Sequence, residues 1–393
     1  MSSQLTVDKP ALSCNITNTA DIVRAQYWFF LCAFSYPSRR LLPCFFLLSL
    51  LVACSQPPVV STINGQTMGT TYSVSVVGNA NDDMFSESNL IDMKLSIDAK
   101  LVVINQLMST YITDSEISRF NQYPHNQWFS LSSETLRVIE YSLYLSELTN
   151  GKFDITVSPL INLWGFGSDG ETDFPSDMLI AQAKEKVGWK ALIVDKGNLR
   201  IKKSKPLTID LSAIAKGYGV DVIAQLLEAQ GVNNYLVEIG GEIRVNGSKP
   251  NGESWRVGVE TPSFFLQGAR KVITLQNVAV ATSGDYRNFF EKDGIRYSHT
   301  IDPVTGRPVI HNIASITVIV ASSDINSPAH SQADSKTYSA MKADGMATAF
   351  MALGEEGALE LANRLALPIY ILRYNEETFT ESFSSSFVSY LNH

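Results

Sequence analysis

The sequence of 393 residues predicts an α+β fold. Segments with helical periodicity and segments with strand-like alternation both recur along the chain. They do not follow the strict strand-helix-strand order of a doubly wound parallel sheet, so mixed sheets with packed helices are expected. Hydrophobic residues make up 45% of the chain and charged residues 18%, a composition that excludes disordered, collagen-like and coiled-coil proteins.

The first half of the main body is predicted to be mostly helical. Alternating residues over Thr70–Val77 predict a strand, and apolar residues at helical spacing predict a helix between Leu90 and Leu107. A second helix is expected from Ser133 to Leu148, because Asn150-Gly151 is a helix-stopping pair. A third is expected from Pro175 to Val187, because Pro-Ser-Asp opens helices.

Strands dominate the second half. The turn Asp195-Lys196-Gly197-Asn198 is expected to join two short strands as a hairpin, and Gly231 to stop a helix that begins at Ala213. The polar, turn-rich stretch Ser322–Ser339 is expected to be an exposed loop. The remaining strands are expected at 191–194, 199–201, 207–211, 235–239, 243–245, 255–260, 271–275, 278–281 and 313–320, and the helices at 213–230, 341–353 and 356–365.

Charge and cysteine content exclude several kinds of site. The formal net charge of −8 would repel nucleic acid, and we identify no local basic patch that would overcome this repulsion. The chain is free of cysteine after residue 54, which excludes disulfides, thiolate zinc sites and cysteine nucleophiles from the main body. The four cysteines are Cys14, Cys32, Cys44 and Cys54.

The amino-terminal segment is predicted to be a targeting signal. Arg39-Arg40 precede an apolar run over residues 41–53, which is short for a membrane-spanning helix. The ending Leu51-Val52-Ala53-Cys54 resembles a bacterial lipobox. This implies that Cys54 is the lipidated first residue of the mature protein and that the body faces an extracytoplasmic compartment. The alternative is an ordinary cleaved signal with a coincidental cysteine.

The expected location is therefore the bacterial cell membrane, with the protein lipid-anchored on the periplasmic side. Ser55 favours the outer membrane by resemblance to bacterial sorting rules, but the choice between inner and outer membrane stays open. Residues 1–38 are unassigned. They are either an upstream extension of the reading frame or, given the apolar stretch Tyr27–Phe34, a short transmembrane segment.

The segment Leu207–Gly219 is the first that could carry chemistry. Asp210 ends a predicted strand just before a helix N-terminus, whose free amides can bind anionic groups. Lys216, one turn into the helix, could add a compact positive charge. The simpler interpretation is structural, with Ser212 as an N-cap and Asp210 as a capping carboxylate.

Asp344 and Thr348 form a second candidate site. They are four residues apart near the start of a predicted helix, so their oxygens lie on one face, where a hard cation could bind both. In the alternative interpretation Asp344 is a first-turn residue favoured by the helix dipole, and Thr348 bonds back to a backbone carbonyl.

Two turn-forming segments, 282–287 and 297–308, bring together glycine, hydroxyl, carboxylate and imidazole groups. His299 is a candidate general base and Asp285 a candidate catalytic carboxylate. The structural alternative is that His299 is a lone histidine in a strand.

Three common catalytic signatures are missing from the sequence. There is no GxxxxGK[ST] loop and no GxSxG elbow, and neither Gly165-Phe166-Gly167 nor Gly217-Tyr218-Gly219 completes GxGxxG. Kinase-type and Rossmann-type nucleotide sites and Ser-His-Asp hydrolysis are therefore disfavoured.

Taken in order, several segments resemble the ApbE family of FAD:protein FMN transferases, from Met68 to Gly354. The resemblance implies one large transferase domain over residues 65–393, after a linker at 54–64, a signal segment at 39–53 and the extension 1–38. The segments that carry it are TMGTTY (67–72), MSTY (108–111), DSEISRFN (114–121), GKFDITV (151–157), PLINLWGFG (159–167), DLSAIAKGYG (210–219), EIGGE (238–242), SGDYR (283–287), HTIDPVTGRP (299–308) and ADGMAT (343–348).

The family resemblance also implies an activity. Members use Mg2+ to move the FMN half of FAD onto a Thr or Ser hydroxyl of an acceptor protein, such as a subunit of a membrane redox complex, and they release AMP. Carried across, Asp344, Thr348 and the backbone carbonyl of Ala213 would hold Mg2+, and His299 would activate the acceptor hydroxyl. The implied FAD contacts are Met68, Tyr111, Lys152, Phe153, Asp154, Asp210, Lys216 and Ile301.

Two other functions fit the same residues. The site could hydrolyse FAD to FMN and AMP, with water in place of the protein hydroxyl. Sequence does not separate this FAD pyrophosphatase from the transferase, because both need the same metal and pyrophosphate contacts. A non-enzymatic flavin-binding lipoprotein is the third possibility, and the loss of Asp344 or Thr348 would be its sign, but both are present.

Overall fold

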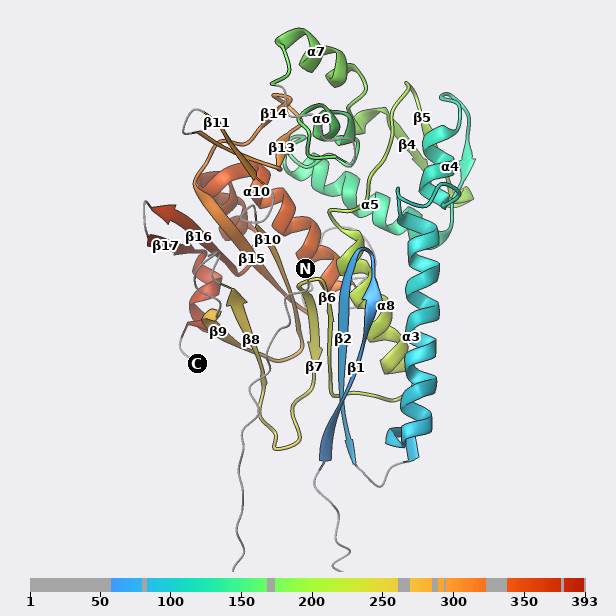
Figure 1. Ribbon diagram of the computed structural model, residues 1–393, viewed down its shortest axis with the longest axis vertical. Coiled ribbons are helices and arrows are strands. Elements are labelled where there is room, and N and C mark those ends of the chain that lie inside the picture. The colour runs from blue at the N-terminus through green and yellow to red at the C-terminus, as the bar shows by residue number, and fades with distance from the viewer. Residues whose placement is uncertain are drawn as a thin grey trace, which may run out of the picture. The chain divides into compact units, whose positions relative to one another are not determined.

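An antiparallel sheet of eight strands is the frame of the protein (Figure 1). The computed structural model describes residues 58–79, 83–167, 174–260, 269–284, 289–292, 295–322, 338–375 and 378–391. The strands run in the order β1-β2-β6-β7-β10-β15-β16-β17, and each neighbouring pair is antiparallel. Their bounds are β1 Pro58–Thr67, β2 Thr70–Asn79, β6 Tyr235–Ile239, β7 Glu242–Asn246, β10 Val278–Gly284, β15 Ile313–Ala321, β16 Ile369–Asn375 and β17 Thr378–Phe383.

Two helices pack on this sheet and on each other. Helix α8 (Ala215–Ala229) contacts β6 and β7, and α10 (Ser339–Arg364) contacts β10, β15 and α8. The other helices are α3 Glu87–Met108, α4 Glu116–Gln122, α5 Ser133–Leu148, α6 Ser158–Leu163 and α7 Asp177–Glu185, with short 3-10 turns η1 Asp83–Phe85, η2 Trp189–Ala191, η3 Lys196–Asn198 and η4 Ser385–Tyr390.

The sheet is buried on both faces. In β10, Ala279 and Ala281 belong to the core that contains the buried side chains of α8 and α10, whereas Val278 and Val280 belong to a second core. This alternation follows from the two-residue period of a strand. Small sheets complete the fold: β8 Trp255–Glu260 with β9 Ala269–Leu275, β3 Phe129–Ser130 with β5 Arg200–Lys203 and β4 Leu192–Asp195, β11 Phe289–Lys292 with β12 Ile295–Ser298, and β13 Ile301–Asp302 with β14 Arg307–Pro308.

The predicted α+β class is confirmed, as are most elements with a strong local signal. Helix α5 has the predicted bounds, and Asn150 and Gly151 stop it with φ angles of 52° and 82°. The hairpin of β4 and β5 also lies where its turn sequence predicts it, with its turn residues in η3.

Two predictions before α8 are wrong. Residues 207–211 are not a strand, because the side chain of Asn121 satisfies the backbone of Ile209 in place of a neighbouring strand. Its Oδ1 accepts the amide of Ile209 at 2.7 Å, and its Nδ2 donates to the carbonyl of Ile209 at 2.9 Å. Helix α8 begins at Ala215 rather than at Ala213, after a turn over residues 212–214. The predicted break between the two C-terminal helices is confirmed, because Gly354 within α10 is non-helical with a φ of 75°, although the first of the two helices begins at Ser339 rather than at Met341.

The predicted linker at 54–64 also overlaps the first strand. Strand β1 pairs with β2 along its whole length, from Pro58 opposite Asn79 to Thr67 opposite Thr70. Most of its side chains are exposed or half-buried, so the strand is held by backbone hydrogen bonds and shows little apolar alternation in the sequence. Sequence inspection also missed α4, α6, β16 and β17, which are short or lack a clear period.

Several predictions lie outside the described residues. These are the extension 1–38, the signal segment, Cys54 with the other three cysteines, Asp285, and the loop 322–339 between residues 323 and 337. The described residues belong to one unit, Gln56–His393. Among them, no helix has both the length and the apolar character needed to cross a membrane.

We expect Gly217→Ala to destabilise the protein by about 1–3 kcal/mol. A Cβ at this position of α8 would lie 2.3 Å from the carbonyl oxygen of Ala340, a backbone atom that can move only with α10. The measurement is the free energy of unfolding in urea. The control is Gly357→Ala in α10, where the new Cβ would be 3.3 Å from the side chain of Leu353. The control should be neutral or stabilising by up to about 1 kcal/mol. Equal losses in both variants would contradict a special close approach at Gly217.

Candidate active site

The candidate site begins where α8 and α10 touch. Gly217 has no side chain, so the backbone of α10 passes close to it, and its amide donates a 2.9 Å hydrogen bond to Oδ2 of Asp344. Asp344 is buried on α10, with 3% of its surface exposed. A buried carboxylate without such partners would be strongly destabilising. The contact between the helices thus places a charged oxygen from one helix at the first turn of the other.

Lys216 lies between two buried carboxylates at this contact. Its Nζ is 2.7 Å from Oε2 of Glu242, at the start of β7, and 3.7 Å from Oδ1 of Asp344. Burial acts against the charge of Lys216, but the two carboxylates outweigh it and raise its pKa. Burial raises the pKa of Glu242 to about 8, and the attraction of Lys216 only partly offsets this. Burial likewise raises the pKa of Asp344, against the effects of Lys216 and the Gly217 amide.

A hydroxyl of α10 meets a hydroxyl of β10: Oγ1 of Thr348 is 3.2 Å from Oγ of Ser283. The neighbouring pair Thr282 and Thr317, with 2.9 Å between their hydroxyl oxygens, lies on the other face of the sheet, because side chains alternate along a strand. Thr348 thus has a hydroxyl partner on β10 instead of a carbonyl of its own helix. Asp344 is the sixth residue of α10, not a first-turn residue. The helix-dipole explanation of the Asp344 and Thr348 pair therefore does not hold.

The approach to α8 is a turn rather than a strand end. Oδ1 of Asp210 accepts the amide of Ser212 at 2.8 Å, and the amide of Asp210 bonds the carbonyl of Ile155. Ile214 is the N-cap residue of α8, so the structural interpretation that made Ser212 the N-cap is wrong. Ala213, the predicted carbonyl ligand, lies in this turn before the helix.

The predicted flavin contacts 152–154 lie beside the turn at 299–308. Nζ of Lys152 is 2.6 Å from Oδ2 of Asp302, which follows the predicted contact Ile301. Asp154 accepts hydrogen bonds from the amide and hydroxyl of Thr156 and the amide of Trp189. Burial nevertheless raises the pKa of Asp154, because these bonds only partly offset the loss of water. The carboxylate therefore stabilises this turn through the hydrogen bonds that it accepts.

The other predicted site residues differ widely in exposure. Phe153 and Ile301 are buried in two different cores. Met68 follows β1 with a φ of 49°, and its Cε is 3.1 Å from the point where a Cβ of Gly219 would lie. The ring of Tyr111, just after α3, is 88% exposed.

The described contacts connect the predicted residues in two groups. Lys216, Asp344 and Thr348 lie together at the contact of α8 with α10, where Met68 also reaches α8. The turn 152–154 meets the turn that contains Ile301, and His299 in that second turn meets the ring of Phe166 edge-on. The hydrogen bond from the amide of Asp210 to the carbonyl of Ile155 links the segment before α8 to the turn 152–154.

Sequence reasoning missed the role of Glu242. It belongs to β7, whose residues Glu242 and Arg244 are both buried. The available signal was that Glu242 and Arg244 alternate with the apolar residues Ile243 and Val245, just after Gly240-Gly241. A buried charge needs a partner, so this pattern predicts ion pairs to neighbouring elements.

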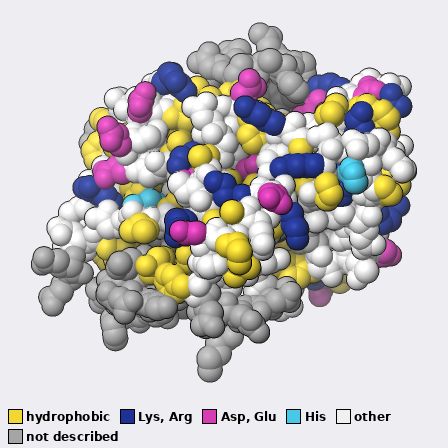
Figure 2. Space-filling model, turned by 90° about the horizontal axis from the view of Figure 1, so that it is seen from above, with side chains coloured by type: hydrophobic (Ala, Val, Ile, Leu, Met, Phe, Trp, Pro, Cys, Tyr) yellow, Lys and Arg dark blue, Asp and Glu magenta, His cyan; other side chains and the backbone are white. Residues whose placement is uncertain are grey.

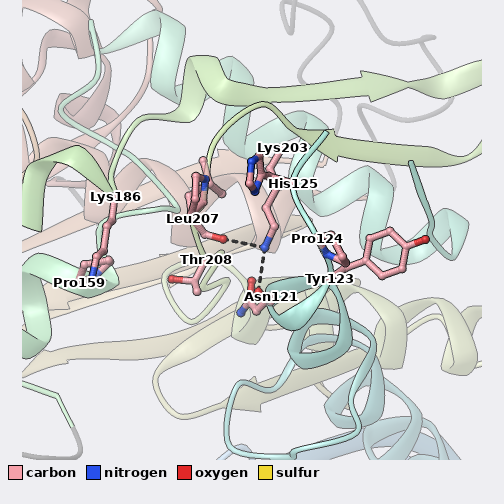
Figure 3. Close-up of a pocket in the computed structure, with 10 residues that line it drawn as sticks. Asn121, Tyr123, Pro124, His125, Pro159, Lys186, Lys203, Leu207 and Thr208 are labelled. Carbon is pink, nitrogen blue, oxygen red and sulfur yellow. Dashed lines mark hydrogen bonds between the residues drawn. The ribbon is translucent and has the colours of Figure 1, made fainter. Parts of the chain in front are cut away.

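A separate pocket of about 360 Å³ lies next to Thr208, two residues before Asp210 (Figure 3). Lys203 is buried in its wall, where its Nζ donates to the carbonyls of Phe120, Asn121 and Leu207. None of the predicted site residues lines this pocket. Its lining residues are Asn121, Tyr123, Pro124, His125, Pro159, Lys186, Lys203, Pro206, Leu207 and Thr208.

The segment 184–205, which contributes Lys186 and Lys203 to this pocket, is locally rich in positive charge. Residues 184–205 contain eight Lys or Arg against two Asp or Glu, Glu185 and Asp195. Several of the cations bind backbone carbonyls, such as Lys184 to Val304 and Lys205 to Glu185. Figure 2, the view from the end of α6 and α7, shows Lys and Arg side chains interspersed with Asp and Glu. The eight cations are Lys184, Lys186, Lys190, Lys196, Arg200, Lys202, Lys203 and Lys205.

Comparison with known proteins gives consistent results. A family model described as the ApbE family matches residues 68–371. A Vibrio cholerae protein named FAD:protein FMN transferase is 40% identical over 349 residues, 88% of this chain and 97% of that protein. The solved flavin transferase ApbE of Vibrio cholerae has a TM-score of 0.72 at 38% identity, over 85% of this chain and 100% of that chain. The apo form of Pseudomonas stutzeri flavinyl transferase ApbE has a TM-score of 0.74 at 34% identity, over 86% and 98%.

We expect a double-mutant cycle on Lys216 and Glu242, with Lys216→Met and Glu242→Gln, to give a coupling energy of about 1–3 kcal/mol. The control is the same cycle on Lys94 and Asp98, an exposed pair on one turn of α3. That pair should couple by only about 0.3–0.5 kcal/mol. Urea unfolding of all variants measures both values. Coupling energies of the same size would contradict a desolvated ion pair at the helix contact.

Proposed function

The chain belongs to the ApbE family, and on this premise we propose that it is an FAD:protein FMN transferase. It moves the FMN half of FAD onto a Thr or Ser hydroxyl of an acceptor protein and releases AMP, with Mg2+ as the metal ion. The relatives that carry this enzyme name match the chain over most of their length, which supports the same reaction here.

The observation that carries the proposal is the contact of Lys216 and Gly217 with Asp344. It brings together a cation and a carboxylate that lie more than 100 positions apart in the sequence. A lysine and a metal-binding carboxylate at one point are what a pyrophosphate substrate requires, because its negative charge must be neutralised during phosphoryl transfer.

The donor atoms at the site suit Mg2+. The carboxylate of Asp344 and the hydroxyl of Thr348 are one helical turn apart, and the carbonyl of Ala213 precedes α8. Oxygen donors of this kind are what Mg2+ prefers. The described residues hold no cluster of three or more His, Cys, Asp or Glu able to bind a metal, so the proposed set depends on the hydroxyl and the carbonyl beside one carboxylate. When bound there, Mg2+ would offset the negative charge of the pyrophosphate.

The chain's own residues orient the flavin nucleotide in this proposal. Lys216 is only partly exposed, and its fixed positive charge can pair with a phosphate oxygen. The exposed ring of Tyr111 offers a face on which an aromatic ring system can stack. Lys152, Met68 and Asp210 are also proposed to contact the flavin nucleotide, as the family resemblance implies.

The reaction is a displacement at phosphorus. The acceptor hydroxyl oxygen forms a bond to the phosphorus of the FMN half, and the bond from that phosphorus to the bridging oxygen breaks. AMP leaves with the bridging oxygen and the electron pair of the broken bond. The hydroxyl proton passes to His299, the candidate base. Asp285 remains a predicted catalytic carboxylate in the same family segment.

We expect Asp344→Ala to abolish Mg2+-dependent FMN transfer while the protein stays folded. The carboxylate is the only charged oxygen in the proposed metal ligand set, so its loss removes most of the attraction for the ion. The assay mixes the full chain with FAD, Mg2+ and an acceptor protein. It measures flavin fluorescence on the acceptor in a gel together with AMP release.

Asp195→Ala, which removes an ion pair in the distant β4–β5 hairpin, is the control and should retain activity. Circular dichroism checks that both variants are folded. Unchanged transfer by Asp344→Ala would refute the metal assignment. AMP release without acceptor labelling in the unmodified protein would identify a hydrolase instead of a transferase.

We further propose that Cys54 carries a lipid that anchors the protein to the periplasmic face of a bacterial membrane, near acceptor subunits of membrane redox complexes. Cys54→Ala should abolish incorporation of labelled palmitate and release the protein from the membrane fraction, because the thiol that carries the acyl chains is gone. Cys44→Ala, in the apolar run of the signal, is the control and should keep both. Membrane association without a label on the unmodified chain would refute lipidation.

A further inference from the structure

Asp221 of α8 contacts the first turn of α10. Its side chain is fully buried, Oδ1 accepts the amide of Ala340 at 3.2 Å, and Oδ2 accepts the amide of Met341 at 2.8 Å. The first amides of a helix have no partner within the helix. In the described part of the chain, the N-cap residue Tyr338 makes no capping hydrogen bond with its side chain. The cap of α10 is therefore supplied by a carboxylate from another helix.

Arg244 of β7 balances the charge of this carboxylate. Its Nη1 is 3.0 Å from Oδ1 of Asp221, its Nη2 is 2.8 Å from Oε1 of Glu228, and its side chain is only 5% exposed. The hydroxyl of Tyr235 donates to the same oxygen of Glu228 at 2.5 Å. Burial raises the pKa of Asp221 to about 6, although Arg244 and the two amides favour the charged form. The strand β7 thus holds the capping carboxylate in place.

The two helices exchange hydrogen bonds in both directions. The amide of Gly217 in α8 donates to Asp344 in α10, and the amides of Ala340 and Met341 in α10 donate to Asp221 in α8. Gly217 and Asp221 are four residues apart, so they lie on one face of α8. The start of α10 is therefore fixed to α8 at two points, one helical turn apart on each helix.

We infer that Asp221 is a positioning residue for the metal site. By capping α10 it sets the position of Asp344 and Thr348 relative to Lys216, and it does so from a fully buried position with no exposed surface to offer a ligand. The non-helical Gly354 separates this first part of α10 from the rest of the helix, so the cap acts mainly on residues 339–353. The inference rests on the proposed function in so far as Asp344 and Thr348 bind Mg2+.

A purely structural role for Asp221 makes a different prediction. Loss of the buried ion pair with Arg244 would then lower stability alone, and metal affinity would change no more than in any variant of equal stability. The two roles are separated by Asp221→Asn and a control, Glu355→Gln. Glu355 lies beyond Gly354, where it accepts hydrogen bonds from Arg373 and Ser382. The control therefore weakens a half-buried ion pair on the other part of the same helix.

The experiment measures two properties of the full chain. Amide hydrogen exchange without metal or flavin reports on the start of α10. Titration with Mg2+ in the presence of FAD, followed by calorimetry, gives the metal affinity. For Asp221→Asn we expect amides 340–346 to exchange at least about tenfold faster and the affinity for Mg2+ to fall by about tenfold or more, as for other supports of metal ligands. For Glu355→Gln we expect both to stay unchanged.

The outcomes separate the two proposals. Unchanged exchange in Asp221→Asn, or a loss of Mg2+ affinity no larger than in Glu355→Gln, would overturn the positioning role. If Asp221→Asn does not fold, Arg244→Lys, which keeps the positive charge but loses one of the two contacts, should give the same shifts in smaller size, and no shift would overturn the role. If the unmodified chain binds no Mg2+, the proposed metal site is wrong, and the exchange data alone decide whether Asp221 fixes α10.

Discussion

The contact between α8 and α10 is the constraint on which the site depends. Two buried carboxylates, Asp344 and Asp221, lie in this contact, and each is stabilised by backbone amides of the opposite helix. A buried charge without such bonds would cost several kcal/mol, so neither helix could shift along the other without a large penalty. The absence of a side chain at Gly217 lets the helices come close enough for these bonds. Packing and electrostatics therefore require the same arrangement.

Strand β7 connects this contact to the main sheet. Its two buried charged residues face different partners: Glu242 pairs with Lys216, and Arg244 pairs with Asp221. Both partners belong to α8, so one strand holds that helix by two ion pairs that lie in the protein interior. Neighbouring β10 adds Ser283, whose hydroxyl meets Thr348 of α10. Two of the proposed metal ligands, Asp344 and Thr348, thus lie on a helix that packs on the main sheet, which suits a reaction that depends on positioning. The third, the carbonyl of Ala213, lies in the turn before α8.

Around the predicted flavin contacts, several polar side chains form hydrogen bonds with backbone groups and so stabilise the local turns. Asp154 organises the turn after α5, and Asn121 takes the hydrogen bonds that a strand neighbour would otherwise provide to Ile209. Lys203 and Lys205 bind carbonyl groups, so much of the positive charge in 184–205 serves the fold. The exposed ring of Tyr111 differs from these residues, because its surface is open to a ligand.

The sequence alone determined the α+β class, the bounds of α5 and the place of the β4–β5 hairpin, because periodicity and stop signals are local properties. It also indicated the family, because the order of the motifs along the chain can be read without the fold. It also placed Asp344 and Thr348 on one helical face. It did not show that β1 is a strand or that 207–211 is not one, since both depend on hydrogen-bond partners elsewhere in the chain. The roles of Glu242, Asp221 and Arg244 became visible only in the tertiary structure, which shows their ion-pair and hydrogen-bond partners. A buried charge is stable only beside a partner, and the packing of α8 and α10 on the sheet decides which partners these residues have.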